Sequence, residues 1–341
     1  MARLGAVLAA AGEPAYRKAQ VLRAVFKGGA SSYAGISCLP SALRARLASD
    51  VPILSLALQR LLASSGGNAR KALLSLRDGE RIESVLLKPR PGGEWCACIS
   101  CQAGCAIGCA ICATGRLGLR RSLSAEEISD QVLFWRQHLA AEEPDGRLTH
   151  VVYMGIGEPF HCWEAVQESL RALLDPDRFA LAARRVSVST SGIVPGIRRF
   201  AAEFPQVNLA VSLHAASDAK RDALVPINRS YPLEALSKAL RETVERTRRK
   251  VFIEYALIDG FNDGPDDARD LGEFVSLCGG RGLVHVNLIP LNPAGGALRP
   301  SSPAVLRSFR DLLRRMRVPV TIRKSLGADI QGACGQLAGG K

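Results

Sequence analysis

Six of the ten cysteines in this chain lie between residues 96 and 112. Three of them, Cys105, Cys109 and Cys112, have the spacing C-x3-C-x2-C, which allows one loop to hold three thiolates around a small inorganic centre. Three thiolates on a [4Fe–4S] cube leave one iron free for another ligand. Cysteines crowded into one stretch predict metal binding in a reducing cytoplasm, whereas a secreted disulfide framework would spread them along the chain.

A structural zinc site is the alternative interpretation of the same residues. Zinc takes four ligands, commonly from two C-x2-C pairs, and Cys98 or Cys101 could supply the fourth. The spacing alone favours iron–sulfur and leaves zinc open. A zinc-stabilised RNA-binding protein without catalysis is the corresponding alternative function.

The charge of the chain favours a polyanionic partner. The net charge is +13, from 45 lysines and arginines against 32 acidic residues. Each phosphate that a cation neutralises releases counterions, which drives such binding. No apolar run approaches the roughly 20 residues of a membrane span. We therefore expect a cytoplasmic protein with no membrane partner.

Strand-like and helix-like segments alternate after about residue 95, which predicts a parallel sheet. Six or seven repeats predict an α/β fold that is a (β/α) barrel or a partial barrel, in which reactive groups sit at the carboxyl ends of the strands. The strand-like runs are WCACIS, LTHVVYM, RRVSVST, VNLAVSL, KVFIEYALI, LVHVNLI and VPVTIRK. The clearest helical runs are SAEEISDQVLFWRQHL, WEAVQESLRALL, PLEALSKALRETVERT and PAVLRSFRDLLRRM.

The part of the chain before the barrel is predicted to be helical up to about residue 75, as a small accessory domain. The runs LLSLRDG and RIESVLLK then indicate a hairpin that turns at Asp78-Gly79. We predict domains at 1–75 (helical, RNA-binding), 76–97 (hairpin linker), 98–330 (barrel) and 331–341 (C-terminal loop).

The cysteine loop and its surroundings resemble the RlmN/Cfr family of radical S-adenosylmethionine (SAM) 23S rRNA adenine methyltransferases, and within it the RlmN branch. The resemblance covers nearly the whole chain in family order. It is carried by CISCQAGCAIGCAICATGRLG (98–118), MGIGEP (154–159), RRVSVSTSGIVPGI (184–197), VSLHA (211–215), LVPINR (224–229), IEYALIDGFND (253–263), NLIPLNP (287–293) and ACGQLAG (333–339).

The resemblance implies an incomplete barrel of the radical SAM type with a small N-terminal helical accessory domain. It also implies methylation of C2 of an adenine in 23S rRNA, with the adenine next to the anticodon of tRNA as a further substrate. An adenine C2–H is not nucleophilic, so methylation there requires a radical route. The implied cofactors are a [4Fe–4S] cluster on Cys105, Cys109 and Cys112 and SAM. The implied electron donor is a protein such as flavodoxin or ferredoxin, and we expect a monomer.

Residue roles follow from the resemblance alone. Cys334 matches the cysteine that takes a methyl group from a first SAM and carries it as S-methylcysteine. Cys98 matches the cysteine that resolves the protein–RNA adduct through a transient disulfide with Cys334, and Glu83 matches a proposed proton acceptor. The residues that match SAM contacts are Gly157, Glu158, Ser189, Ser212, Leu213, His214 and Asn292.

Three departures from the family pattern leave the RNA target open. Cys101 stands where the pattern usually has serine, Cys96 is an additional cysteine, and Ile111 replaces a common aromatic residue. Methylation at C8 of adenine, as in the Cfr branch, is the near alternative. The clusters of basic residues are mostly expected to be solvated; among them Arg116, Arg120 and Arg121, which follow the cysteine loop, are the candidates for phosphate contact.

Overall fold

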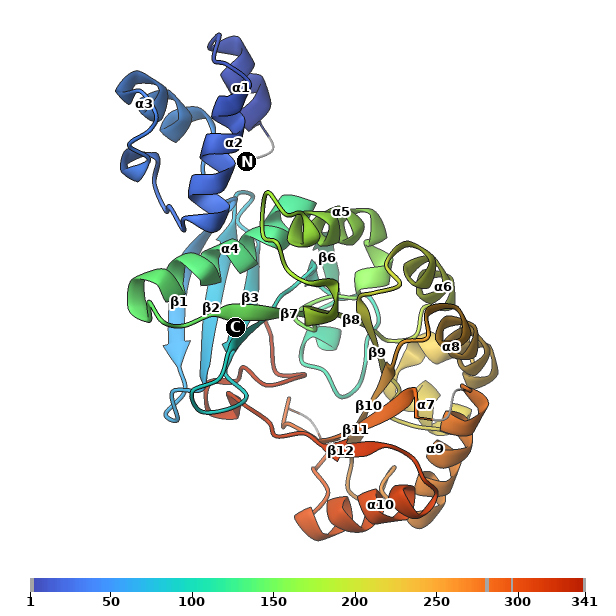
Figure 1. Cartoon of the computed structure of the whole chain (residues 1–341). Helices are drawn as coiled ribbons and strands as arrows, with labels where there is room; N and C mark the ends of the chain where they lie inside the picture. The colour runs from blue at the N-terminus through green and yellow to red at the C-terminus, as the bar shows by residue number, and fades with distance from the viewer. Residues whose placement is uncertain (1–2, 280–281, 296, 340–341) are drawn as a thin grey trace.

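The computed structural model describes residues 3–279, 282–295 and 297–339. Its main feature is a ten-stranded sheet in the order β1-β2-β3-β4-β7-β8-β9-β10-β11-β12, curved like part of a barrel (Figure 1). Within the described ranges β1 and β12 are the two edges of this sheet, so the predicted incomplete barrel is confirmed. The strands are β1 (Leu56–Ala63), β2 (Ala69–Leu76), β3 (Arg81–Leu87), β4 (Trp95–Cys98), β7 (Leu148–Tyr153), β8 (Val186–Thr190), β9 (Asn208–Ser212), β10 (Val251–Leu257), β11 (Val284–Pro290) and β12 (Val320–Ile322).

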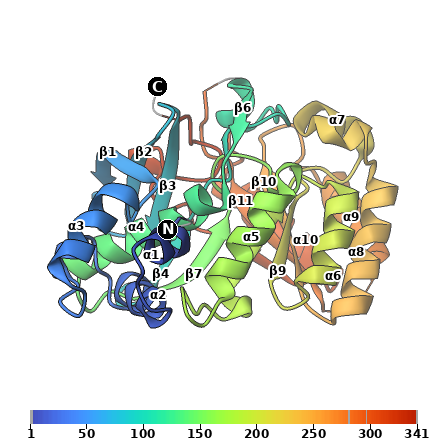
Figure 2. The same cartoon turned by 90° about the horizontal axis from the view of Figure 1, so that it is seen from above.

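The seven parallel strands coincide with the seven strand-like runs of the sequence. Their residues are rich in buried valine, isoleucine and leucine, as expected for strands covered on both faces. The connecting helices follow the outer side of the curved sheet (Figures 1 and 2). These helices are α4 (Ala125–Glu142), α5 (Trp163–Leu174), α6 (Val194–Glu203), α7 (Asp218–Leu224), α8 (Leu233–Thr247), α9 (Pro265–Leu277) and α10 (Pro303–Arg315).

The N-terminal region begins with helices α1 (Leu4–Ala10), α2 (Tyr16–Leu22) and α3 (Ser41–Asp50), with a π-helical turn over Arg23–Lys27. They lie beside α4 (Figure 2). Phe26 packs edge-on against Phe179 with ring centroids 4.9 Å apart. Arg136 of α4 donates to the carbonyl of Phe26 at 3.3 Å. Residues 1, 2, 340 and 341, at the ends of the predicted domains, lie outside the described residues.

The prediction of helix as far as residue 75 is wrong from residue 56 onward, where β1 and β2 form an antiparallel pair. The segment LALQRLLA of β1 is rich in helix-favouring leucine, but it is an edge strand with mostly exposed side chains. The hairpin around Asp78-Gly79 is confirmed as β2–β3. It is not a separate linker, because Val85 of β3 pairs with Cys98 of β4 and joins the hairpin to the parallel strands.

Within the described parts of the chain, no helix combines the length and the apolar character needed to cross a bilayer.

Candidate active site at the carboxyl ends of the strands

The cysteine loop is the connection of a small two-stranded sheet, β5 (Gln102–Gly104) with β6 (Leu119–Ser122). The amide of Cys105 donates to the carbonyl of Gly118 at 2.9 Å and closes the base of the loop. Gly104 has φ +79°, and a Cβ there would collide with the carbonyl oxygen of Gly118. The sequence therefore needs glycine at this position for the loop to leave β5 at this angle.

The strand leading into this loop is fixed by buried polar contacts. Gln131 of α4 accepts from the amide of Ser100 and donates to its carbonyl, both at 2.8 Å. The hydroxyl of Ser100 accepts from the amide of Ile156 at 2.8 Å. These contacts tie the segment after β4 to both α4 and the segment after β7. The loop thus has a rigid base.

The three thiols of the loop suit a cationic centre. The pKa of Cys105 is raised to about 11, chiefly by burial, with smaller contributions from the charges of Glu158 and Cys112. Burial, followed by Cys112 and Cys105, likewise raises the pKa of Cys109. Three thiolates this close together and this poorly solvated would be costly unless bound metal compensates their charge, and coordination deprotonates a thiol outright. The donor set therefore fits an iron–sulfur cluster.

A mononuclear zinc site fits less well. Among the described residues, no three His, Cys, Asp or Glu side chains converge on one point as zinc requires. In a four-iron cube each thiolate binds a different iron, so the thiols need not converge. The two candidate fourth ligands also have other surroundings. Cys98 is packed with Val85, Ile156 and Leu337. Cys101 lies beside the free thiol of Cys162, and its pKa is raised first by burial and then by that thiol.

Glu158 presents a buried carboxylate beside the loop. Its Oε2 accepts from the amide and the hydroxyl of Ser191 at 2.7 and 2.8 Å, and its Oε1 accepts from the amide of Phe160 at 3.1 Å. Gly157 has φ +108°, and a Cβ there would lie 2.6 Å from the Cβ of Gln102. The carboxylate is therefore held in one orientation by three donors, next to the thiols whose pKa it raises.

The other predicted SAM contacts lie along neighbouring strand ends, as the barrel geometry predicts. Ser189 lies on β8 opposite Ala210 of β9. Ser212 ends β9, and Leu213 and His214 follow it. Asn292 follows β11, and its amide donates to the carbonyl of Cys334 at 3.1 Å. The side chain that contacts Glu158 is Ser191, which directly follows β8 and lies two residues after the predicted Ser189.

His214 is a buried, neutral imidazole with an unusual backbone. Its φ is +60°, and Nδ1 accepts from the amide of Ala256 at 3.0 Å. Burial lowers the pKa of His214 to about 3, with a further contribution from Arg221. Because Nδ1 accepts, the proton of the neutral ring is on Nε2. The histidine can therefore donate one hydrogen bond but carries no charge near neutral pH.

Arg221, which sequence analysis missed, links two of these strand ends. It is fully buried and donates to the carbonyls of Ser191 at 2.5 Å and Leu213 at 3.2 Å. It also donates to Oδ1 of Asn228 at 2.7 Å. Burial lowers the pKa of Arg221 to about 10, so it stays charged at neutral pH and lowers the pKa of Cys109. Arg221 lies just before the segment ALVPINR (223–229), and no residue spacing in the sequence indicates that it is buried.

The C-terminal segment brings Cys334 to the cysteine loop. In Figure 1 this segment runs from β12 back toward β1–β3. The amide of Ala113, next to Cys112, donates to the carbonyl of Gly335 at 2.7 Å. Cys334 is open to solvent, yet enough protein surrounds it that desolvation raises its pKa, with contributions from Glu254 and Cys112. Burial, then Cys334, raises the pKa of Cys98, so the two thiols are electrostatic neighbours.

Glu83 is not the solvated surface residue that an isolated hairpin glutamate would be. It is buried, and its Oε1 lies 2.8 Å from Nζ of Lys71. Its Oε2 accepts from the amides of Ala338 and Gly339 at 2.7 and 3.1 Å. The structure therefore places Glu83 against the same C-terminal segment that carries Cys334.

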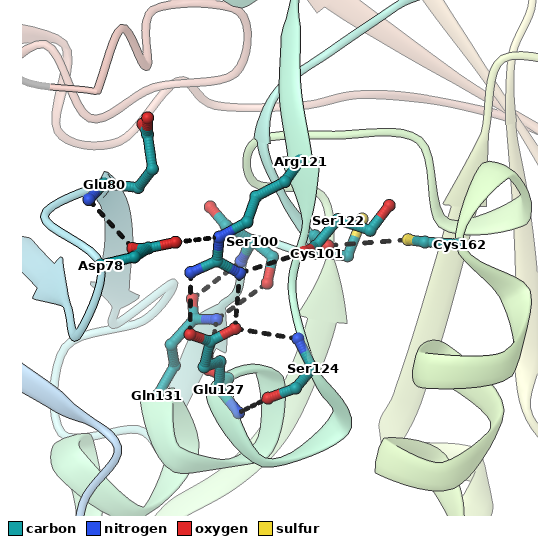
Figure 3. A network of polar contacts seen from close by, with 10 residues as sticks. All are labelled: Asp78, Glu80, Ser100, Cys101, Arg121, Ser122, Ser124, Glu127, Gln131 and Cys162. Atoms are coloured by element: carbon teal, nitrogen blue, oxygen red, sulfur yellow. Dashed lines mark hydrogen bonds and ion pairs between the residues drawn. The ribbon is translucent and has the colours of Figure 1, made fainter.

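The candidate phosphate contacts differ in how free they are. Arg121 pairs with Asp78 at the hairpin turn and with Glu127 at the start of α4, where Glu127 also belongs to a capping box (Figure 3). Arg116 donates to the carbonyls of residues 294 and 295. Arg120 is the most open, with 67% of its side chain exposed and one ion pair to Glu80 at 3.2 Å.

A pocket of about 330 Å³ lies beside the cysteine loop. It is lined by Ile111 of the loop, Phe261, Leu291, Asn292 and Pro293, among other residues. A slightly larger groove, of about 360 Å³, lies on the outside between α8 and α9 and has none of the site residues in its wall. The pocket next to Ile111 is the one whose place suits the chemistry of the thiols.

Comparison with known proteins agrees with an iron–sulfur site at the cysteine loop. The sequence pattern of the Radical SAM superfamily matches residues 99–273. A probable dual-specificity RNA methyltransferase RlmN from Moorella thermoacetica is 44% identical over 96% of this chain and 92% of its own length. The dual-specificity RNA methyltransferase RlmN 1 from Myxococcus xanthus is 41% identical over 98% and 91%. The crystal structure of a radical SAM methyltransferase from Sphaerobacter thermophilus is 43% identical with a TM-score of 0.91, covering 98% of this chain and 96% of that one. This chain therefore belongs to the RlmN family of radical SAM RNA methyltransferases.

Proposed function

We propose that this enzyme methylates C2 of an adenine in 23S rRNA, and the adenine next to the anticodon of tRNA, through a methyl group carried on Cys334. The observation that supports the proposal is the position of the Cys334 segment next to the cysteine loop and near Cys98. The hydrogen bond from Ala113 to Gly335 holds this segment at the cysteine loop, and Cys334 is close enough to Cys98 to raise the pKa of that thiol. The names of the relatives, which include dual specificity, support two RNA substrates.

The cofactors are assigned to the residues whose chemistry fits them. Cys105, Cys109 and Cys112 hold the cluster. The carboxylate of Glu158 binds the amino group of SAM, and Gly157, Ser189, Ser212, Leu213, His214 and Asn292 line the rest of its site. With a donor such as flavodoxin or ferredoxin, the bound cluster and SAM would supply one-electron chemistry: a radical that can remove a hydrogen atom from the methyl group on Cys334, and an acceptor for one electron once the methylene carbon has bonded to C2.

The remaining steps belong to the side chains of the chain itself. Glu83 accepts the proton of C2, which restores the aromatic base. The Cys98 thiolate then attacks Sγ of Cys334 and forms a disulfide. The bond from that sulfur to the methylene carbon breaks, and its electron pair stays on the carbon, which takes a proton and becomes the methyl group. A dithiol reductant afterwards returns the disulfide to two thiols.

Helices α1 to α3 and exposed basic residues such as Arg120 contribute to RNA binding in this proposal. In this proposal the enzyme works as a cytoplasmic monomer, and residues far apart in one chain contribute to the site: Lys71 and Glu83 lie on the N-terminal side and contact the C-terminal segment that carries Cys334.

The test is single-turnover methylation of 23S rRNA and tRNA fragments by anaerobically purified enzyme, with mass spectrometry of the RNA. C334A should lose all methylation, and C98A should accumulate a covalent protein–RNA species. C38A is the matched control, because Cys38 is an exposed cysteine of the N-terminal region. Methyl groups found only on C8 would overturn the C2 assignment, and normal turnover by C98A would overturn the resolving role.

A further inference from the structure

The loop that carries Cys334, residues 331–339, is held near both ends by one ion pair. Lys71 of β2 and Glu83 of β3 form this pair, with Nζ and Oε1 2.8 Å apart. Nζ of Lys71 also donates to the carbonyl of Gln331 at 3.2 Å, where the loop begins. Oε2 of Glu83 accepts from the amides of Ala338 and Gly339, where it ends. We call this ion pair, with its three backbone contacts, the clasp.

The clasp is buried, so its charges depend on each other. The side chains of Lys71 and Glu83 are 9% and 4% exposed. Removing one charge from such a pair leaves the other in a poorly solvated place, which costs far more than the loss of an exposed ion pair. Between the two tethered ends, the hydroxyl of Thr114 donates to the carbonyl of Leu337 at 2.7 Å and guides the loop along the cysteine loop.

Holding the loop and accepting a proton both require the carboxylate oxygens of Glu83. In the seated loop, Oε2 accepts two backbone amides at 2.7 and 3.1 Å, and Oε1 faces the lysine ammonium. A proton taken from carbon would have to bond to one of these oxygens. A neutral carboxyl group also binds amides and an ammonium more weakly, because charge-assisted hydrogen bonds are roughly twice as strong as neutral ones. Proton uptake and a fully seated loop therefore oppose each other.

We propose that the clasp couples the charge of Glu83 to the seating of the Cys334 loop, with Lys71 as a positioning residue. This inference rests on the proposed function, in which Glu83 receives the C2 proton. In that step the proton moves from C2 to a carboxylate oxygen, and the electron pair of the C–H bond stays in the base. The carboxyl group then releases residues 338 and 339, and the loosened loop lets Cys98 reach Sγ of Cys334, which is still bonded to the methylene carbon on the base.

Hydrogen exchange of the loop amides tests the clasp without RNA and without turnover. The protein is the cluster-loaded full chain, and the amides of Ala338 and Gly339 are followed in wild type, E83Q, K71M and K71Q. E83Q keeps the shape of the side chain and removes its charge. Exchange at these two amides should be about tenfold faster in E83Q and in the lysine variants. In E83Q the charge-assisted bonds to the amides become neutral ones, and in the lysine variants the ion pair that holds the carboxylate is lost.

Lys88 provides a matched control. It is also on the β3 side of the sheet and pairs with Glu143 at 2.6 Å, but it has no part in the clasp. K88M should leave exchange at residues 338 and 339 unchanged. K71R keeps the positive charge, so exchange at these amides should be as slow as in wild type. K71Q keeps a donor for the carbonyl of Gln331 and serves if K71M does not fold.

Turnover gives a second readout that a purely structural lysine would not produce. In K71Q the rate constant for methylation should fall while the KM for RNA stays within about twofold, since the clasp acts after RNA is bound. Exchange at residues 338 and 339 that is the same in E83Q as in wild type would overturn the clasp. That outcome would leave the methyl-carrier role of Cys334 standing, because C334A and C98A test it separately.

Discussion

Replacing Glu158 with glutamine should destabilise the site even though the two side chains have the same shape. Oε2 of Glu158 accepts two hydrogen bonds from Ser191, one of them from its amide. Oε1 accepts from the amide of Phe160. In glutamine one of these two positions becomes an NH2 group. Whichever way the amide is turned, an NH2 then faces a backbone N–H that has lost its acceptor.

The size of the effect follows from this donor–donor conflict. A buried donor left without an acceptor costs about 1–3 kcal/mol, and the loss of a hydrogen bond to a charged group adds a similar amount, so E158Q should cost about 2–6 kcal/mol. S191A should cost about 1 kcal/mol, because the hydroxyl bond is lost but the backbone amide keeps its carboxylate partner. E164Q is the control, since its side chain is 79% exposed and such changes stay within about 0.5 kcal/mol.

The assay is urea unfolding of the apo-protein, with SAM affinity measured on the cluster-loaded protein by calorimetry. The proposed ammonium contact predicts that E158Q loses at least about 2 kcal/mol of SAM binding, or roughly thirtyfold in affinity. A wild-type urea midpoint for E158Q would refute the three-donor geometry. A lowered midpoint with unchanged SAM affinity would keep the geometry and refute the role of Glu158 in binding.

Three other predictions rest on single contacts. G157A should lower the urea midpoint and SAM affinity together, because it forces a side chain into φ +108° and places Cβ 2.6 Å from its neighbour; wild-type SAM affinity would contradict this. The burial-lowered pKa of His214, about 3, means that stability is lost as pH falls below the unfolded value near 6.5. This loss should reach about 2 kcal/mol between pH 8 and pH 5; H214Q should remove this slope in urea unfolding, and H161Q at an exposed position should keep it. R121M should lower stability without changing the salt dependence of RNA binding, whereas R120M should reduce the slope of log K against log salt concentration by about one. Filter binding at several salt concentrations measures this slope. The reverse pattern would show that Arg120, the more exposed arginine, is not the phosphate contact.

The parallel part of the fold was predictable because its signal is local. Each of its strands is a short apolar run, and helices such as α5 and α10 carry regular apolar faces, so periodicity alone places them. The strand β1 gave no such signal. Its side chains are mostly exposed along LALQRLLA, and only the pairing with β2 makes it a strand. Propensity is a weak guide where tertiary pairing decides.

The site shows the same division. Cys105 and Glu158 lie in motifs whose spacing is visible in the sequence. Arg221 acts through Ser191, a partner 30 residues away, and no spacing rule connects these two positions. Lys71 and Glu83 are neighbours across the β2–β3 hairpin, but the hairpin alone does not show that the pair is buried. The burial of Glu83 could not be predicted, because the sequence does not show that the C-terminal segment returns to cover it.

The return of that segment also explains how two thiols can stay reduced side by side until they are needed. The thiolate is the reactive form of cysteine, and burial raises the pKa of both Cys98 and Cys334. Leu337 packs on Cys98 together with Val85 and Ile156. Seating the loop therefore brings Cys334 close and, with the same leucine, keeps Cys98 dry and protonated. In the proposed mechanism, a movement that lifts residues 337–339 would admit water to Cys98 and lower the cost of its thiolate, so the resolving thiol would become reactive only when the loop is loosened.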